Sequence, residues 1–334
     1  MDALELTRAL VALETPTGSE GPAIDFLDGA LRRAGHRTAR QPVTRGRENL
    51  LAFRETPELV FSTHVDTVPP HIPLSEDDEV IGGRGSCDAK GIAAAMVVAA
   101  DRLAALGERR IGLLFLVGEE NGSDGARAAA ELEPRGRFLV NGEPTENRLS
   151  IGQKGSLRVD LEATGRAAHS AYPEEGVSAI TALLDTIARL QRMPLPSDPL
   201  LGPSTLNVGL IQGGVAPNVI APRATAQVLI RTVEPTDALQ ATICGLAAPG
   251  VSIRFPVELP FHKGGVAPPG WETTVVSFTS DLPFLRSWGE GFQLGPGSIR
   301  VAHTAEEHIR KADLLQGIDL YVRLAADLLA RRAP

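Results

Sequence analysis

Cysteine, long apolar runs and basic clusters are all scarce in this chain of 334 residues, and each scarcity excludes a class of protein. The two cysteines, Cys87 and Cys244, are too few for a disulfide framework, so the chain suits a reducing compartment. No apolar run approaches the ~20 residues of a membrane-spanning helix, and acids stand where a signal peptide would be basic. The net charge of −8, without Lys/Arg clusters, argues against nucleic-acid binding. We therefore expect a soluble, cytoplasmic protein that binds neither membrane nor nucleic acid.

The apolar residues follow two different patterns along the chain. Up to about residue 150, helix-like spacing alternates with nearly continuous apolar strands such as Ile111 to Val117, which is typical of a sheet covered by helices. Beyond Gly155, apolar and polar residues alternate in strands around two helices, as in a small α+β layer with one solvated face. Gly264-Gly265 marks a place where the chain could return to the first domain, and a last helix is predicted from Ala305 to Leu329.

Histidine and acidic residues gather where the predicted strands end. His64 and Asp66 follow an apolar strand two residues apart, so their side chains point the same way before Pro69-Pro70 ends the strand. Such a pair alone could be purely structural. Four further stretches in similar positions contain Asp88, Glu119 with Glu120, Glu143, and His303. Because carboxylates collected in the crevice beyond a sheet need a cation, the pattern indicates a divalent metal, and these ligand types suit zinc.

Several of these stretches also have a simpler interpretation. Gly83 to Gly91 could be a phosphate loop, although Gly91 follows Lys90 where such a loop needs Ser or Thr. Glu119-Glu120 could be a solvated acidic loop, and Asp88 could cap an Ala-rich helix. Cys87 could be a nucleophile, but no base is paired with it in the sequence. The occurrence of all five stretches together favours the metal site.

In their order along the chain, the five stretches resemble the motifs of the dinuclear zinc aminoacylase and peptidase family. This family includes acetylornithine deacetylase, succinyl-diaminopimelate desuccinylase and related carboxypeptidases, and the resemblance covers essentially the whole chain. It implies an α/β fold in which a zinc-peptidase-like catalytic domain, residues 1–153 and 263–334, has a mixed sheet flanked by helices. It also implies an inserted, smaller α+β domain, residues 154–262, that serves as lid and dimerisation domain and makes the chain a homodimer.

The resemblance further implies a role for each matching residue. The metal ligands would be His64, Asp88 and Glu143 for one ion, and Asp88, Glu120 and His303 for the other. Asp66 would orient His64 from behind, and Glu119 would be the general base that deprotonates a water shared by two zinc ions. Cobalt and manganese suit the same ligands.

Outside the metal ligands, the resemblance assigns substrate contacts. His169, in the stretch Ala167-Ala-His-Ser-Ala171, matches a residue that stabilises the tetrahedral oxyanion in its own or the neighbouring subunit's site. Asn218 and Arg231 match positions that hold the substrate, although an Asn turn and a surface Arg are the plainer interpretations. Gly295 and Gly297 would offer backbone N–H groups to a substrate carboxylate.

The implied function is hydrolysis of the amide bond of an N-acyl amino acid by a metal-bridged hydroxide. The form His64-Val-Asp-Thr-Val-Pro-Pro70 and the stretch Thr279-Ser-Asp281 favour an acetylornithine deacetylase-like enzyme. One alternative, suggested by Ile151-Gly-Gln-Lys-Gly155, is release of lysine or ornithine from an amino-group carrier protein. A carboxypeptidase or dipeptidase that acts on short peptides is another. A metal-free binding homologue is disfavoured because every candidate ligand is present.

Overall fold

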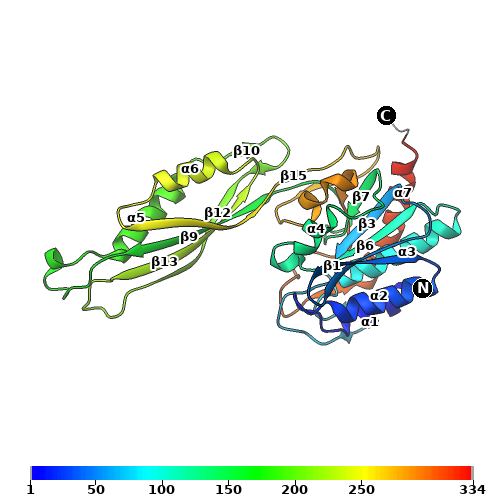
Figure 1. The fold of residues 1–334 in the computed structure, drawn as a ribbon, viewed down its shortest axis with the longest axis horizontal. Helices are drawn as coiled ribbons and strands as arrows, with labels where there is room; N and C mark the ends of the chain where they lie inside the picture. Colours follow the sequence, from blue (N-terminus) through cyan, green and yellow to red (C-terminus); the bar gives the residue numbers. More distant parts are fainter. Residues whose placement is uncertain (1, 332–334) are drawn as a thin grey trace. The chain divides into compact units, whose positions relative to one another are not determined.

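The computed structural model describes residues 2–331, and the chain forms two compact units (Figure 1). The first unit contains the chain up to Gly152, Lys263–Val276, and the chain from Ser280 onward. The second contains Gln153–His262 and Ser277–Thr279. No helix within residues 2–331 is long and apolar enough to cross a membrane.

A nine-stranded mixed sheet forms the centre of the first unit, in the order β1-β2-β6-β3-β7-β17-β8-β15, with β16 paired to β8. The strands are β1 (Arg37–Thr44), β2 (Arg47–Phe53), β3 (Leu59–His64), β6 (Ile111–Leu116), β7 (Phe138–Asn141), β8 (Leu149–Gln153), β15 (His262–Lys263), β16 (Thr273–Val276) and β17 (Glu290–Gln293). Strand β3 runs parallel to β6 and β7, and β7 runs parallel to β17. Both β3 and β6 are buried throughout, and for β6 the nearly uninterrupted apolar sequence predicted this.

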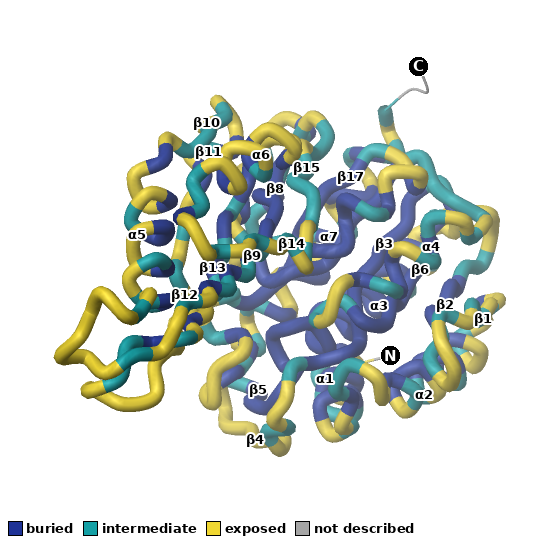
Figure 2. Tube along the Cα trace, turned by 60° about the vertical axis from the view of Figure 1, so that its left-hand side comes forward, coloured by how far each residue is buried: buried dark blue, intermediate teal, exposed yellow. Residues whose placement is uncertain are grey.

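Helices cover both faces of this sheet. The apolar residues of α1 (Ala3–Val11), α2 (Gly21–Arg33), α3 (Lys90–Ala105) and α7 (Lys311–Leu329) share one core with Leu59 and Phe61 of β3. Val60 of β3 points to the other face, where it joins α4 (Asp124–Ala129) and the turns Leu282–Phe284 and Arg286–Trp288. Figure 2 shows that burial is concentrated in β3, β6 and α3. The predicted α/β class, a mixed sheet flanked by helices, is confirmed.

The predicted last helix from Ala305 is wrong at its start, because α7 begins at Lys311. Residues His308–Arg310 instead form β18, which pairs with β5 (Val80–Gly82). With β4 (Ser75–Glu76), these strands make a separate three-stranded sheet in the first unit.

The second unit is a four-stranded antiparallel sheet in the order β12-β13-β9-β14. Its strands are β9 (Gly155–Thr164), β12 (Thr205–Gly213), β13 (Arg223–Thr232) and β14 (Val251–Leu259), and its helices are α5 (Ala179–Arg192) and α6 (Asp237–Gly245). Two short strands, β10 (Ser197–Asp198) and β11 (Gly202–Pro203), form a hairpin beside them. Burial alternates along β9 and β13 because one sheet face packs on α5 and α6.

Candidate metal centre

The carboxyl ends of parallel strands bring the predicted site residues to one edge of the central sheet. His64 is the last residue of β3, Glu119 and Glu120 open the turn after β6, and Glu143 follows β7. Asp88 lies just before α3, but it does not cap this helix: the capping position is Ala89, and no side chain caps the helix there. The position of these residues is the one in which ligand sites of open α/β sheets form.

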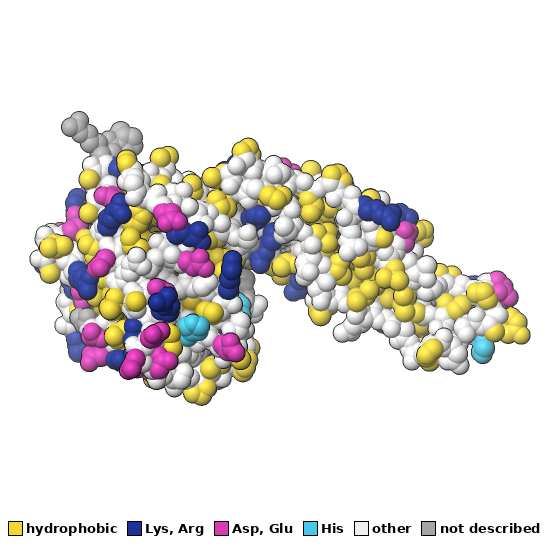
Figure 3. Space-filling view, turned by 180° about the vertical axis from the view of Figure 1, so that it is seen from behind, with side chains coloured by type: hydrophobic (Ala, Val, Ile, Leu, Met, Phe, Trp, Pro, Cys, Tyr) yellow, Lys and Arg dark blue, Asp and Glu magenta, His cyan; other side chains and the backbone are white. Residues whose placement is uncertain are grey.

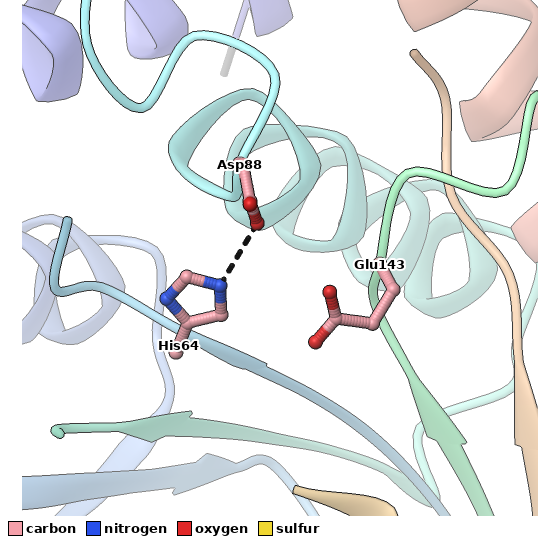
Figure 4. A group of neighbouring side chains, drawn as sticks. All are labelled: His64, Asp88 and Glu143. Atoms are coloured by element: carbon pink, nitrogen blue, oxygen red, sulfur yellow. Dashed lines mark hydrogen bonds and ion pairs between the residues drawn. The ribbon is translucent and has the colours of Figure 1, made fainter. Parts of the chain in front are cut away.

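Two three-residue clusters share the carboxylate of Asp88. The ligand atoms of His64, Asp88 and Glu143 lie within 4.8 Å of one another, and so do those of Asp88, Glu120 and His303. His64 Nε2 is 3.1 Å from Asp88 Oδ1, whereas His303 Nε2 is 3.2 Å from Asp88 Oδ2 and 3.0 Å from Glu120 Oε1. Figure 4 shows the first cluster, with His64, Asp88 and Glu143 pointing toward one another. Each oxygen of Asp88 therefore faces a different cluster.

His64 Nδ1 faces both the backbone carbonyl and the carboxylate of Asp66, and the carbonyl oxygen is the closer of the two. His64 Nδ1 lies 3.0 Å from the Asp66 carbonyl oxygen and 3.5 Å from Asp66 Oδ1. A neutral ring that donates from Nδ1 leaves the Nε2 lone pair facing Asp88. The Asp66 carboxylate also accepts the N–H groups of Glu119 at 3.1 Å and Glu120 at 3.2 Å, and the Thr17 hydroxyl at 2.7 Å. Asp66 thus connects the first histidine to both glutamates.

The electrostatics of the site fit a divalent cation. Burial, followed by the charges of neighbouring carboxylates, raises the pKa of Glu119 and of Glu143 well above the usual value. Glu143 Oε1 is buried without a hydrogen-bond partner among the described residues. Hydrogen bonds to Asp88 and Glu120 raise the pKa of His303 to about 10. Crowded carboxylates, two imidazoles and one orphaned buried oxygen form a donor set that suits zinc, cobalt or manganese.

His303 reaches its cluster from an unusual backbone conformation. Its φ is +63°, in the left-handed region that non-glycine residues rarely adopt, and its side chain is 49% exposed. Such a conformation costs about 1–3 kcal/mol and persists where the surroundings impose it. The backbone here directs the imidazole toward Asp88 and Glu120.

The loop with Gly295 and Gly297 packs against this centre. The N–H of Gly295 donates to Thr145 Oγ1 at 3.1 Å, so it is already paired within the first unit, which disfavours the predicted contact with a substrate carboxylate. A Cβ at Gly295 would collide with the Glu143 carbonyl oxygen. Gly297 has a φ of +87° and lies against Cys87. Gly295 therefore allows the close approach of the strand end that carries Glu143.

The remaining predicted residues, His169, Asn218 and Arg231, lie in the second unit. His169 Nδ1 accepts the N–H of Ala171 at 3.1 Å, and the loop of Asn218 is tied to that of His169 because Ser170 N–H donates to the Asn218 carbonyl at 3.1 Å. Arg231 is half-buried in β13, burial lowers its pKa, and no carboxylate pairs with it within residues 2–331.

Sequence reasoning gave no role at this centre to two residues: Thr17, which contacts Asp66, and Asp281, whose charge contributes to the raised pKa of Glu119 and Glu143. Thr17 donates to Asp66, and Asp281 is a buried acid whose pKa is raised to about 7, chiefly by burial. Neither belongs to a stretch that follows an apolar strand, so no local pattern marks them. In the stretch Ile151 to Gly155, Lys154 is buried and donates to the Pro203 carbonyl at 2.6 Å, which is a structural contact.

Comparison with known proteins agrees with this geometry. A family model described as a peptidase dimerisation domain matches residues 151–243, and a model of peptidase family M28 matches residues 49–189. A peptidase M20 domain-containing protein of Schizosaccharomyces pombe is 37% identical over 96% of this chain and 83% of its own length. A probable carboxypeptidase of Aspergillus fumigatus is 35% identical over 99% of this chain and 87% of its own.

Solved structures share the fold at lower identity. A tripeptidase from Staphylococcus aureus superposes with a TM-score of 0.79 at 22% identity, covering 98% of both chains. An M20 family metallo-carboxypeptidase from Sulfolobus solfataricus superposes with a TM-score of 0.75 at 15% identity, covering 98% of this chain and 99% of the other. With near full-length relatives above 30% identity, this fold and the dimerisation domain, the chain belongs to the M20 family of metallopeptidases.

Proposed function

We propose that this chain hydrolyses the amide bond beside a free carboxylate and so releases the last amino acid of a short peptide. The observation that carries the proposal is the shared carboxylate of Asp88, whose two oxygens face two separate clusters of ligands. Glu119 lies next to Glu120 but belongs to neither cluster, so its carboxylate stays available for proton transfer.

The two clusters would hold one divalent ion each. The residues that would hold them are His64, Asp88 and Glu143 for the first, and Asp88, Glu120 and His303 for the second. When bound, two such ions, zinc first and cobalt or manganese as alternatives, polarise a carbonyl and lower the pKa of water.

Proton transfer falls to Glu119 in this proposal. Its backbone N–H is held by the Asp66 carboxylate, and burial raises its pKa well above the usual value, which makes its carboxylate a stronger proton acceptor. Glu119 takes the proton from the attacking water and delivers it to the nitrogen of the leaving amine. Asp66 keeps Glu119 in place and leaves the His64 Nε2 lone pair available.

Residues of the second unit would bind and polarise the substrate. Because His169 Nδ1 accepts the N–H of Ala171, the proton of the neutral ring is on Nε2, which is then a donor for the oxyanion, in its own chain or across a dimer. Arg231 lacks a carboxylate partner among the described residues, so its planar guanidinium remains free for a substrate carboxylate, with Asn218 as a second polar contact.

Two classes of substrate are candidates, a short peptide and an N-acyl amino acid. Near full-length relatives named probable carboxypeptidases support a peptide, whereas the stretch Thr279-Ser-Asp281 favours an acetylornithine deacetylase-like enzyme. We would assay dipeptides, tripeptides and N-acetyl and N-succinyl amino acids with added zinc or cobalt, each with its C-terminal amide as control. We expect turnover of free-acid peptides that a chelator abolishes. Turnover confined to N-acetylornithine would favour the second candidate, and turnover of acids and amides alike would contradict the carboxylate requirement.

We further propose that the chain forms a homodimer through the edge strand β12. This strand is the outer member of its sheet, and Leu210 and Ile211 on it are 56% and 52% exposed. Exposed aliphatic residues on an unpaired edge are typical of a protein interface. Figure 3 shows hydrophobic side chains gathered on one face of the second unit. Light scattering should give a dimer for the parent chain and a monomer for Leu210→Glu with Ile211→Lys; a monomeric parent would contradict this proposal.

A further inference from the structure

We propose that Glu307 is a positioning residue that fixes Asp88, and thereby fixes the geometry of both metal clusters at once. Glu307 lies four residues after His303 and is only 2% exposed, although it is charged in isolation. It belongs to neither cluster, and a buried carboxylate is retained only where its oxygens are paired.

Both oxygens of Glu307 are paired with the loop that carries Asp88. Oε1 accepts three backbone N–H groups, from Gly85 at 2.9 Å, Cys87 at 3.3 Å and Asp88 at 3.1 Å. Oε2 accepts Nη1 of Arg84 at 2.6 Å. Successive N–H groups converging on one oxygen form an anion-binding nest, which here is filled by the protein's own side chain.

Backbone pairing reinforces this contact. The N–H of Gly83 donates to the Glu307 carbonyl at 3.0 Å, and the next residues form β18 against β5. Arg84 is itself held, because its N–H donates to the Ile72 carbonyl and its Nε to the Pro70 carbonyl. The segment that supplies His303 and the loop that supplies Asp88 are thus joined although more than two hundred residues separate them.

Asp88 contributes its carboxylate to both metal clusters, so its position affects both of them. Because its two oxygens face His64 and His303 separately, a shift of its backbone would misplace a ligand in both clusters. Glu307 holds the Asp88 N–H directly, so only the side-chain torsions of Asp88 are left to set its position. Residues that hold metal ligands by hydrogen bonds typically lower the metal affinity about 10–100-fold when they are removed.

The test uses cobalt titration of the metal-free chain, followed by its visible absorption, with the melting temperature of the metal-free form as a second readout. Glu307→Ala should weaken binding of both ions by about 100-fold and Glu307→Gln by about 10-fold, since the amide keeps one oxygen for the N–H groups. The Glu307→Gln spectrum should change, and its metal-free melting temperature should fall but still report a folded chain, because the amide NH₂ faces Arg84 Nη1 and loses a charged hydrogen bond. Glu306→Gln, at an exposed neighbouring residue, is the matched control and should behave as the parent.

Three outcomes would overturn the inference. Parent-like cobalt affinity and spectrum in Glu307→Gln and Glu307→Ala would contradict it, and if Glu307→Ala does not fold, Glu307→Gln decides alone. A lower melting temperature with unchanged cobalt binding would make Glu307 merely structural. The inference rests on the proposed metal clusters: failure of the parent chain to bind cobalt would contradict the proposed function and the inference with it, whereas unchanged binding in the variants contradicts only the inference.

Discussion

Asp66→Asn should destabilise the first unit, because the Asp66 carboxylate is buried and serves three donors. Oδ1 accepts the N–H of Glu119, and Oδ2 accepts the N–H of Glu120 and the hydroxyl of Thr17. Asn keeps one oxygen and replaces the other by an NH₂ group. The Thr17 hydroxyl can turn to accept from that group, but a backbone N–H cannot. One hydrogen bond to a charged acceptor is lost and a donor is left unpaired, so we expect a loss of about 2–4 kcal/mol in the free energy of unfolding.

Urea unfolding of the metal-free chain, followed by tryptophan fluorescence, would measure this loss. Both tryptophans, Trp271 and Trp288, lie in the first unit, so the signal reports the unit that contains Asp66. The control is Asp25→Asn, which makes the same chemical change at a side chain that is 69% exposed and paired with Arg40. A surface pair of this kind is worth about 0–1 kcal/mol. If Asp66→Asn lowers the free energy of unfolding no more than this control does, the stabilising hydrogen bonds assigned to the Asp66 carboxylate are refuted.

The same residue predicts a dependence of stability on pH. Burial alone would raise the pKa of Asp66, but the His64 ring and the Thr17 and Glu120 hydrogen bonds outweigh it and hold the pKa below the ordinary value of 3.8. A carboxyl group whose pKa is lower in the folded chain stabilises that chain at pH values above its pKa in the unfolded chain. This stabilisation is lost as the pH falls through the pKa in the folded chain. The acid limb of the stability curve should therefore be flatter in Asp66→Asn than in the parent; parallel curves would contradict this account.

Four further substitutions test individual roles. Glu119→Gln should lower kcat by about 10²–10⁴-fold while the metal content stays at the parent's value, since Glu119 is in neither cluster; retained activity would exclude it as the base. His64→Ala and His303→Ala should each release chiefly one ion in equilibrium dialysis and still unfold cooperatively, because two carboxylates remain in each cluster; non-cooperative unfolding would mark a structural histidine. Arg231→Lys should lower kcat/KM for free-acid substrates by the equivalent of about 2–5 kcal/mol and much less for the matching amides; equal losses would place carboxylate recognition elsewhere.

Much of the fold could be predicted because the spacing of apolar residues along the sequence indicates which faces of a strand or helix are buried. The uninterrupted apolar residues of Ile111 to Leu116 specify a strand covered on both faces, and the alternation in Gly155 to Thr164 specifies a sheet with one covered face. Three residues of the two candidate metal clusters, His64, Glu120 and Glu143, could also be predicted in this way, since they lie at or just after the carboxyl ends of parallel strands in the sequence.

Contacts between distant segments could not be predicted in this way. Residues 305–310 have the composition of a helix start, but His308–Arg310 pair with Val80–Gly82, and this tertiary pairing overrides the local preference. Asp66 was expected to serve only His64 two residues away, but its carboxylate also binds N–H groups of Glu119 and Glu120 more than fifty residues away. Single-sequence patterns carry no information about which distant donors will surround a buried acid.

The central claim is that Asp88 is shared by two metal ions, and the metal content of the purified chain tests it most directly. Elemental analysis after dialysis against a slight excess of zinc should give two ions per chain for the parent protein. Because Asp88 supplies one oxygen to each cluster, Asp88→Ala should lose both ions, whereas His64→Ala and His303→Ala should each keep one. A parent protein that carries one ion or none, or an Asp88→Ala variant that still holds two, would contradict the account.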